Sequence, residues 1–168
     1  MDTNEIRQIL QSDVYTASIF ADCLPIDWIP NPLPEGRLWV INLGDSNTDG
    51  FHWCSLSTLE APESVFWFNP LGDPPPQKII PKLLSAASRI YYADIPLQSI
   101  STVTCGHLST LMCLFLARSE TPLEALSHFP TPDSQPYLTV DFFAHQIISA
   151  LTDLRDKSLI NWELFKEP

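Results

Sequence analysis

The hydrophobic pattern predicts strands across the middle of the chain. Segments 37–43 and 51–59 are aromatic and β-branched with a two-residue period, and a polar run rich in Gly, Asn and Asp separates them. This arrangement is typical of a hairpin. Two further apolar segments, 64–72 and 89–95, are bounded by turn residues and predict a third and a fourth strand. The middle of the chain is therefore expected to form a sheet.

Outside these segments, apolar residues recur with the helical period. Segment 105–118 is apolar over most of its length, which predicts a buried central helix. Segment 23–36 holds four prolines and is interpreted as an ordered loop without regular structure. The expected helices cover residues 3–12, about 79–87, 105–118, a short segment that starts at Thr121 and Pro122, and 139–156.

These elements predict an α+β fold in which a central mixed, antiparallel-rich sheet of four to five strands packs against helices. At 168 residues the chain is expected to form a single domain, residues 1–168, that folds without a metal or a disulfide. The longest apolar run, 111–117, is too short to span a bilayer. The polar N-terminal stretch is not typical of a secretory signal.

Charge and cysteine content narrow the range of functions. The net charge is −11 and the nine basic residues are scattered, which argues against direct binding to nucleic acid. The four cysteines (Cys23, Cys54, Cys105 and Cys113) contain no CxxC pair and predict a reduced, intracellular protein. A zinc site built from His52 and Cys54 with Cys105 or Cys113 is a sharper alternative. It lacks the paired spacing of zinc ligands, so we expect no metal.

The polar run 45–50, Asp-Ser-Asn-Thr-Asp-Gly, matches the opening of a calcium-binding EF-hand loop. Such a loop requires a Glu at its position 12, where this chain has Leu56. It also requires a helix on each side, and both flanking segments here are predicted strands. The run is therefore interpreted as a hairpin turn that precedes His52.

Cys105 is a candidate nucleophile because it lies at the predicted start of the central helix. Backbone dipoles at a helix start lower the pKa of a thiol, and the free N–H groups there can hold an oxyanion. His52 is the candidate base, Asn69 the candidate acceptor that orients it, and Gln98 a candidate oxyanion donor. Each residue also has a plain structural interpretation, as a packing, turn or loop residue. For Cys113, in the middle of the helix, packing is preferred.

Together these motifs resemble the adenovirus-type cysteine proteases (the adenain family) and, more distantly, the proteases of SUMO- and ubiquitin-like modifiers. The matching segments are GFHW (50–53), VFWFNPLG (65–72) and QSISTVTCG (98–106), in that order. The family has a His-Trp pair on a strand and an acidic residue in a Phe-acid-Pro-x-Gly context on the next strand. A Gln then lies seven residues before a Cys-Gly pair. The resemblance covers roughly residues 3 to 120.

The resemblance implies an adenain-like fold whose nucleophile begins a buried central helix. It also implies a cysteine endopeptidase of viral origin that cleaves virion precursor proteins at Gly-containing sites. The implied catalytic residues are Cys105, His52, Asn69 and Gln98, and the implied substrate-binding residues are Gly50 and Trp53.

This chain departs from the family in two ways. Asn69 stands where the family has an acidic residue. Its carbonyl can accept a hydrogen bond from an imidazole, but it supplies no charge. Family members are stimulated by DNA and by a viral peptide attached through a disulfide. No cysteine lies in residues 55–104, where that disulfide would form, and the net charge is −11. Neither activator is therefore expected, and no cofactor is predicted.

The expected partner is a polypeptide substrate, a viral precursor protein, with an activating peptide that is not disulfide-linked as a further possibility. Nucleic acid and membranes are not expected as partners, and the protein is expected to be a monomer. An intracellular, reducing location is expected, which for a viral protein means the host nucleus or the virion. Two other functions stay open: a protease for ubiquitin- or SUMO-like modifiers, and a non-catalytic binding protein on a decayed protease scaffold.

Overall fold

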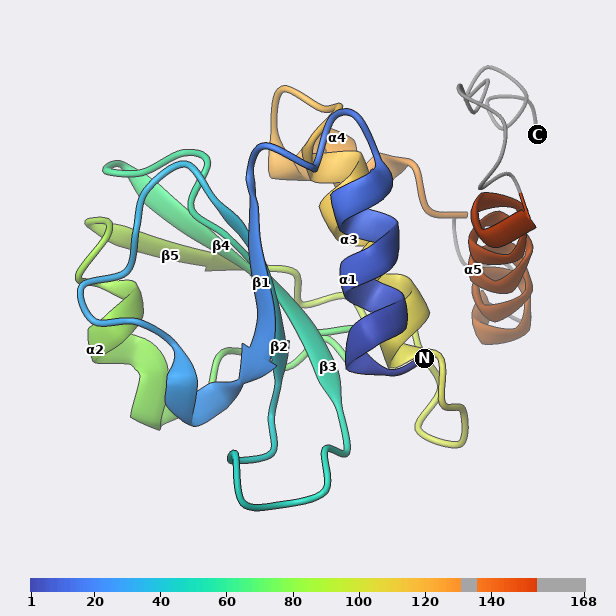
Figure 1. The fold of residues 1–168 in the computed structure, drawn as a ribbon, viewed down its shortest axis with the longest axis horizontal. Coiled ribbons are helices and arrows are strands. Elements are labelled where there is room, and N and C mark those ends of the chain that lie inside the picture. Colours follow the sequence, from blue (N-terminus) through green and yellow to red (C-terminus); the bar gives the residue numbers. More distant parts are fainter. Residues whose placement is uncertain (131–135, 154–168) are drawn as a thin grey trace.

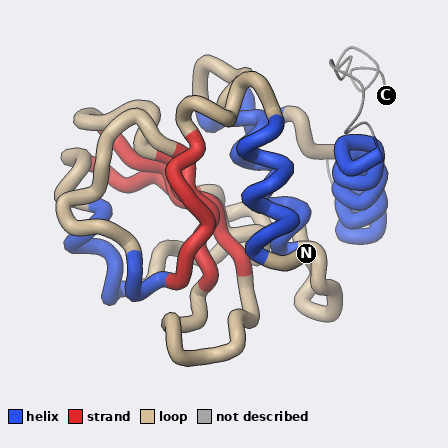
Figure 2. Tube along the Cα trace, viewed as in Figure 1, coloured by secondary structure: helices blue, strands red, loops and turns tan. Residues whose placement is uncertain are grey.

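The computed structural model describes residues 1–130 and 136–153. The sheet lies between helices on its two sides (Figure 1), and long loops join many of the elements (Figure 2). In chain order the elements are α1 (Thr3–Ser12), β1 (Phe20–Pro25), the 3-10 helix η1 (Ile26–Trp28), β2 (Leu38–Asn42), β3 (Trp53–Ser57), β4 (Ser64–Phe68), the 3-10 helix η2 (Gln77–Ile79), α2 (Ile80–Leu83), β5 (Arg89–Tyr92), α3 (Cys105–Leu116), α4 (Pro122–Ser127) and α5 (Pro136–Asp153).

The strands of the described residues form one mixed sheet in the order β1-β2-β3-β4-β5. The central pairings, β2 with β3 and β3 with β4, are antiparallel. The outer pairings, β1 with β2 and β4 with β5, are parallel. The predicted α+β fold with a mixed sheet is therefore confirmed, and its pairings divide equally between the two directions. β3 is the central strand, so the segment that leads into it lies between two neighbouring strands.

Both faces of the sheet are buried. Successive side chains of β2 and β4 point alternately into two separate cores, as the two-residue period of a strand requires. Because both faces are covered, each of these strands is a continuous apolar run in the sequence. The residues on the α3 face are Leu38, Val40, Phe66 and Phe68, and those on the α2 face are Trp39, Ile41, Val65 and Trp67.

The larger core is built around α3. Every residue of α3 except His107 is buried, as the sequence predicts for a central helix. Helices α1, α4 and α5 lie on the same side of the sheet as α3, and α2 lies on the opposite side (Figure 1). α5 contributes Val140, Ala144 and Ile147 to this core, so the helix is held by its own apolar face. The first residue of α3 consequently lies in a closely packed environment.

Two expectations from the sequence require correction. Residues 23–36 are not irregular throughout, because β1 extends to Pro25 and η1 follows it. Within the sheet, β1 pairs only with β2, so a proline at its end removes no hydrogen bond from a second neighbour. The helix expected at 79–87 is also shorter, since α2 ends at Leu83.

α5 matches the helix expected at 139–156, although residues 154–156 lie outside the described part of the chain. No helix among the residues described here has both the length and the apolar character needed to cross a membrane.

Candidate active site

Cys105 is the first residue of α3, and it is only 8% exposed. The helix start is capped in an unusual way. Thr104 occupies the N-cap position, but its side chain makes no hydrogen bond to the helix backbone. The N–H groups of the first turn are thus not consumed by a side-chain cap. The backbone at Trp53 and Gly106 acts to lower the pKa of the Cys105 thiol.

His52 lies directly before β3 and is buried. Its carbonyl oxygen accepts the N–H of Leu43 at 2.9 Å, which extends the pairing of β2 and β3 up to the histidine. Asn42 is buried beneath the connecting turn, and its Oδ1 accepts the N–H of Gly44 at 2.8 Å. A Cβ atom on Gly50 would lie 2.2 Å from Asn42 Nδ2. Only glycine therefore fits at position 50, two residues before the imidazole.

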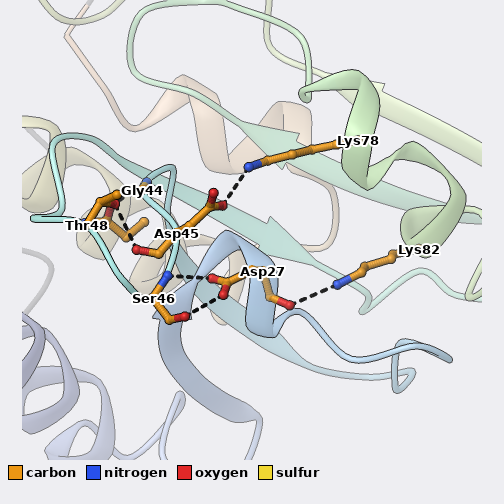
Figure 3. Close-up of polar contacts among 8 residues, drawn as sticks. Asp27, Gly44, Asp45, Ser46, Thr48, Lys78 and Lys82 are labelled. Atoms are coloured by element: carbon orange, nitrogen blue, oxygen red, sulfur yellow. Dashed lines mark hydrogen bonds and ion pairs between the residues drawn. The ribbon is translucent and has the colours of Figure 1, made fainter.

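The polar turn between β2 and β3 is tied to the 3-10 helices η1 and η2 (Figure 3). Ser46 donates its backbone N–H and its hydroxyl to the two carboxylate oxygens of Asp27, at 2.8 and 2.6 Å. The ammonium group of Lys78 pairs with the Asp45 carboxylate at 2.7 Å. Thr48 donates its hydroxyl to the backbone carbonyl of Asp45 at 2.8 Å. The turn joins two strands rather than two helices, so it lacks the frame of an EF-hand.

Asn69 follows directly after β4, and it is 3% exposed. Its Oδ1 lies 2.7 Å from Nε2 of His52. The same oxygen accepts the backbone N–H of Leu71 at 3.0 Å. This second bond determines which end of the amide faces the imidazole, since a backbone N–H must face an oxygen. The contact expected from the sequence is present, and its catalytic role stays a prediction.

His52 and Cys105 interact closely enough for each to shift the pKa of the other. Because Asn69 Oδ1 can only accept, Nε2 of His52 carries a proton and Nδ1 is left for Cys105. Burial acts to lower the pKa of His52, but the hydrogen bonds to Cys105 and Asn69 outweigh it, and the pKa is raised. Burial acts to raise the pKa of Cys105, but hydrogen bonds from His52 and the Trp53 backbone outweigh it, and the pKa is lowered. The two shifts together favour a thiolate beside an imidazolium.

The pKa values of the other three cysteines are shifted upwards, in the direction opposite to that of Cys105. All four thiols are free and buried. Burial raises the pKa of Cys23 to about 12, and it raises the pKa values of Cys54 and Cys113 well above those of ordinary thiols. Within the described residues, no group of three or more His, Cys, Asp or Glu side chains is placed to hold a metal ion. The alternative of a zinc site therefore gains no support.

Gln98 lies on a loop that is fastened to the turn after Asn69. The backbone N–H groups of Leu97 and Gln98 both donate to the carbonyl oxygen of Pro70, each at 2.9 Å. The side-chain Nε2 of Gln98 donates to the backbone carbonyl of Thr102 at 2.8 Å, which orients the amide. A primary amide has two N–H groups, so a second donor remains on Nε2. The role of Gln98 as an oxyanion donor stays a prediction.

Trp53 packs against the first turns of α3. A Cβ atom on Gly106 would lie 3.2 Å from Cδ1 of Trp53, and the Ser109 hydroxyl donates to the Trp53 carbonyl at 3.0 Å. The Cys-Gly pair thus lets the tryptophan ring approach the helix closely. The substrate-binding roles of Trp53 and Gly50 stay predictions, because the contacts described here are contacts within the protein.

Sequence reasoning missed several residues that support this site. Asn42 fills the space beneath the turn, and Thr104 donates its hydroxyl to the carboxylate of Asp141 on α5. The exposed carboxylate of Asp73 acts as a nearby negative charge that also raises the pKa of His52. Thr104 lies within the motif at 98–106, and Asp73 directly follows the motif at 65–72 and is an alternative acceptor for His52 on sequence grounds. Asn42 and Asp141 had no sequence signal.

Comparisons with known proteins give a likeness of structure without a likeness of sequence. No protein-family model matches the chain, and no curated protein matches it. Solved structures of the ASFV pS273R protease do match. One has a TM-score of 0.54 at 16% identity, covering 86% of this chain and 66% of that protein. Its Se-Met form has a TM-score of 0.45 at 18% identity, covering 64% of this chain and 43% of the other.

The first of these matches decides the fold. This chain has the fold of a protease. It spans less than two thirds of the length of the matched structures, and at 16% identity the likeness is one of fold alone. The comparison shows a shared fold, and it does not single out the adenovirus-type family.

Proposed function

We propose that this protein is a cysteine endopeptidase whose nucleophile is Cys105. The observation that carries the proposal is the contact of Asn69 with His52 at 2.7 Å, together with the interaction of His52 with Cys105, which raises the pKa of the imidazole and lowers that of the thiol. A structural cysteine in an apolar environment has a raised pKa, as Cys113 does. Activation of one buried thiol out of four supports catalysis rather than packing.

Acylation follows from this geometry. The Cys105 thiolate attacks the scissile carbonyl carbon, and the electron pair of the C=O bond moves to the oxygen. Backbone N–H groups at the start of α3 and the second N–H of the Gln98 amide would stabilise this oxyanion. When the C–N bond breaks, the His52 imidazolium gives its proton to the leaving amine. A thioester between substrate and Cys105 remains.

Deacylation uses the same groups in reverse order. Nδ1 of His52, now unprotonated, takes a proton from a water molecule that attacks the thioester carbonyl. The C–S bond breaks, the acid product leaves, and the thiolate–imidazolium pair is restored. Asn69 holds the ring in one orientation through both steps by accepting from Nε2. The nearby charge of Asp73 compensates in part for the missing charge at position 69.

The substrate class rests on the motif resemblance. We propose polypeptide substrates with Gly-containing cleavage sites, and viral precursor proteins as their natural source. An intracellular, reducing location is consistent with four free thiols. A protease for Gly-Gly-ended modifiers would use the same chemistry on a different substrate.

The decisive experiment is labelling with a peptide that ends in Gly-Gly and carries an electrophile, followed by mass spectrometry of the labelled cysteine. We expect label on Cys105, loss of label in Cys105→Ala, and retention of label in Cys113→Ala. Cleavage of Gly-containing peptides, compared with that of ubiquitin- and SUMO-like precursors, then identifies the substrate class. A protein that neither takes up label nor cleaves any of these substrates would be the non-catalytic scaffold, and the proposal would fail.

A further inference from the structure

α5 reaches the active site through a single buried carboxylate. Asp141 is 8% exposed, and its Oδ1 accepts the hydroxyl of Thr104, the residue that immediately precedes Cys105. Thr104 is itself only 2% exposed. The contact joins two positions 37 residues apart. It therefore links α5, which lies beyond the family-like motifs, to the residue before the candidate nucleophile.

Close contacts of Thr104 extend this link to the loop that carries Gln98. The Thr104 hydroxyl has one proton, which it donates to Asp141, so towards Thr102 it can only accept. The Thr102 hydroxyl donates its own single proton to the Ser99 carbonyl at 3.1 Å, so it lies against the Thr104 hydroxyl, 3.3 Å away, as a close polar contact. The backbone carbonyl of Thr102 in turn accepts Nε2 of Gln98 at 2.8 Å. Asp141 is thus the end of a row of contacts that reaches the Gln98 amide.

Stability alone gives no reason for a carboxylate at position 141. Oδ2 of Asp141 is buried and has no hydrogen-bond partner among the described residues, which is unfavourable for a charged group. α5 also docks through contacts that do not involve Asp141. Val140, Ala144 and Ile147 bury its apolar face, and the rings of His107 and His145 pack against each other with centroids 4.3 Å apart.

We propose that Asp141 is a positioning residue of the active site: through Thr104 it holds the loop of residues 98–104 so that the Gln98 amide faces the developing oxyanion. This inference rests on the proposed peptidase function. Asp141 acts on the loop and does not touch substrate. The C-terminal helix is then part of the catalytic machinery, which the motifs alone do not indicate.

The test compares Asp141→Ala with Asp141→Asn in the full chain. Alanine removes the acceptor, and we expect kcat to fall by about 10- to 100-fold with little change in KM, since misplaced groups slow the chemical step. Asparagine keeps an Oδ1 acceptor for Thr104, and we expect it to restore kcat to within about threefold of the parent protein. Gln146→Ala, at an exposed position on the same helix, is the matched control and should have no effect.

Two further readouts separate positioning from general damage. Alkylation of Cys105 by iodoacetamide needs the thiolate and no oxyanion donor, so its rate should be unchanged in Asp141→Ala. Hydrogen exchange of backbone amides in residues 98–104 should become faster, while exchange within α3 should not. A loss of alkylation together with faster exchange throughout α3 would indicate a structural role and overturn the proposal.

The exchange measurement does not depend on catalysis. If the parent protein cleaves nothing, the proposed function fails. Asp141 as an anchor of the loop can still be judged, because unchanged exchange over residues 98–104 in Asp141→Ala would refute it. If the parent protein is active and Asp141→Ala is equally active, only the positioning role is lost.

Discussion

The carbonyl oxygen of Pro70 accepts the backbone N–H of Gln98 at 2.9 Å. This bond joins two loops with different predicted tasks, because Pro70 follows Asn69, the candidate acceptor for His52, and Gln98 is the candidate oxyanion donor. The Phe-Asn-Pro-Leu-Gly motif and the Gln seven residues before the cysteine therefore form one unit in space. Any change that moves the turn after β4 should disturb the orientation of the base and of the oxyanion donor together.

Gly72 offers a direct test of this coupling. Its φ angle is +81°, and a Cβ atom there would lie 3.0 Å from the backbone nitrogen of Pro96. We expect Gly72→Ala to destabilise the protein by about 1–2 kcal/mol, because an L-residue is strained in the left-handed region. We also expect a fall in kcat, because the added methyl pushes the loop of residues 95–98 away from Pro70. Thermal unfolding and steady-state kinetics measure the two effects.

Gly36→Ala is the matched control. Gly36 has a φ angle of +67°, and nothing lies within 4 Å of its Cβ position. It should lose a similar amount of stability and keep its turnover. Equal turnover in the two variants would show that the contact between the turn and the loop does not matter for catalysis.

Cys105 should be alkylated by iodoacetamide more than about tenfold faster than Cys113 at pH 7, because each unit of pKa changes the thiolate fraction tenfold. The pKa of Cys105 is lowered, so its thiolate persists below the ordinary thiol range and is lost only as the pH falls through that lowered pKa. The pKa of Cys113 is raised, so its thiol stays protonated at neutral pH. Alkylation rates between pH 5 and 9, resolved by mass spectrometry, give both profiles.

His52→Ala identifies the cause of that reactivity. The imidazole is the strongest influence that lowers the pKa of Cys105, so its loss should move the alkylation profile of Cys105 towards higher pH and leave Cys113 unaffected. An unshifted profile would mean that the helix start, and not the histidine, activates the thiol.

Calcium and EDTA should leave the melting temperature and the peptidase activity unchanged. The carboxylate of Asp45, which would be the first ligand of an EF-hand, is paired with Lys78, and position 12 is Leu56. A ligand that binds only the folded state must raise the melting temperature. Differential scanning fluorimetry with and without millimolar calcium checks this, and a calcium-dependent increase would revive the metal-binding interpretation of the turn.

Much of the fold could be predicted because its signals are local. The bounds of α1 agree with the sequence because Asp2 and Glu5 form a capping box where the helical period begins. The start of α3 could be predicted because the largely apolar segment 105–118 follows a mostly polar loop segment. β1 was missed because the prolines of residues 23–36 hid a strand that pairs with β2 alone. β1 forms because it pairs with β2, and a local sequence pattern does not show which segments will pair.

The same distinction applies to the site. His52, Asn69 and Cys105 each lie next to a local signal: a polar turn, an Asn-Pro pair and a helix start. Asn42 and Asp141 have no such signal. Asn42 is defined by the glycines that close over its side chain, and Asp141 by the way α5 docks on α3. Such residues become apparent only when the elements are packed together.

Variants of Asn69 distinguish an active enzyme from a non-catalytic protein on a decayed protease scaffold. Asn69→Ala removes the acceptor of Nε2 and frees the ring, so we expect kcat to fall by about 10- to 100-fold, less than the loss in Cys105→Ala or His52→Ala. Asn69→Asp keeps the acceptors for His52 and Leu71 and adds a charge beside the imidazolium. It should match or exceed the parent protein, with the pKa of His52 raised further.

Asn47→Ala, in the exposed turn, is the control for asparagine removal and should behave as the parent protein does. Peptide cleavage assays over a range of pH measure all of these variants. If Asn69→Ala cleaves as fast as the parent protein, Asn69 is a turn residue only, because an orienting acceptor cannot be removed without cost. If the parent protein is inactive and Asn69→Asp becomes active, the natural chain lacks the charge that its own geometry is arranged to use. The function would then be that of a scaffold that has lost its acid.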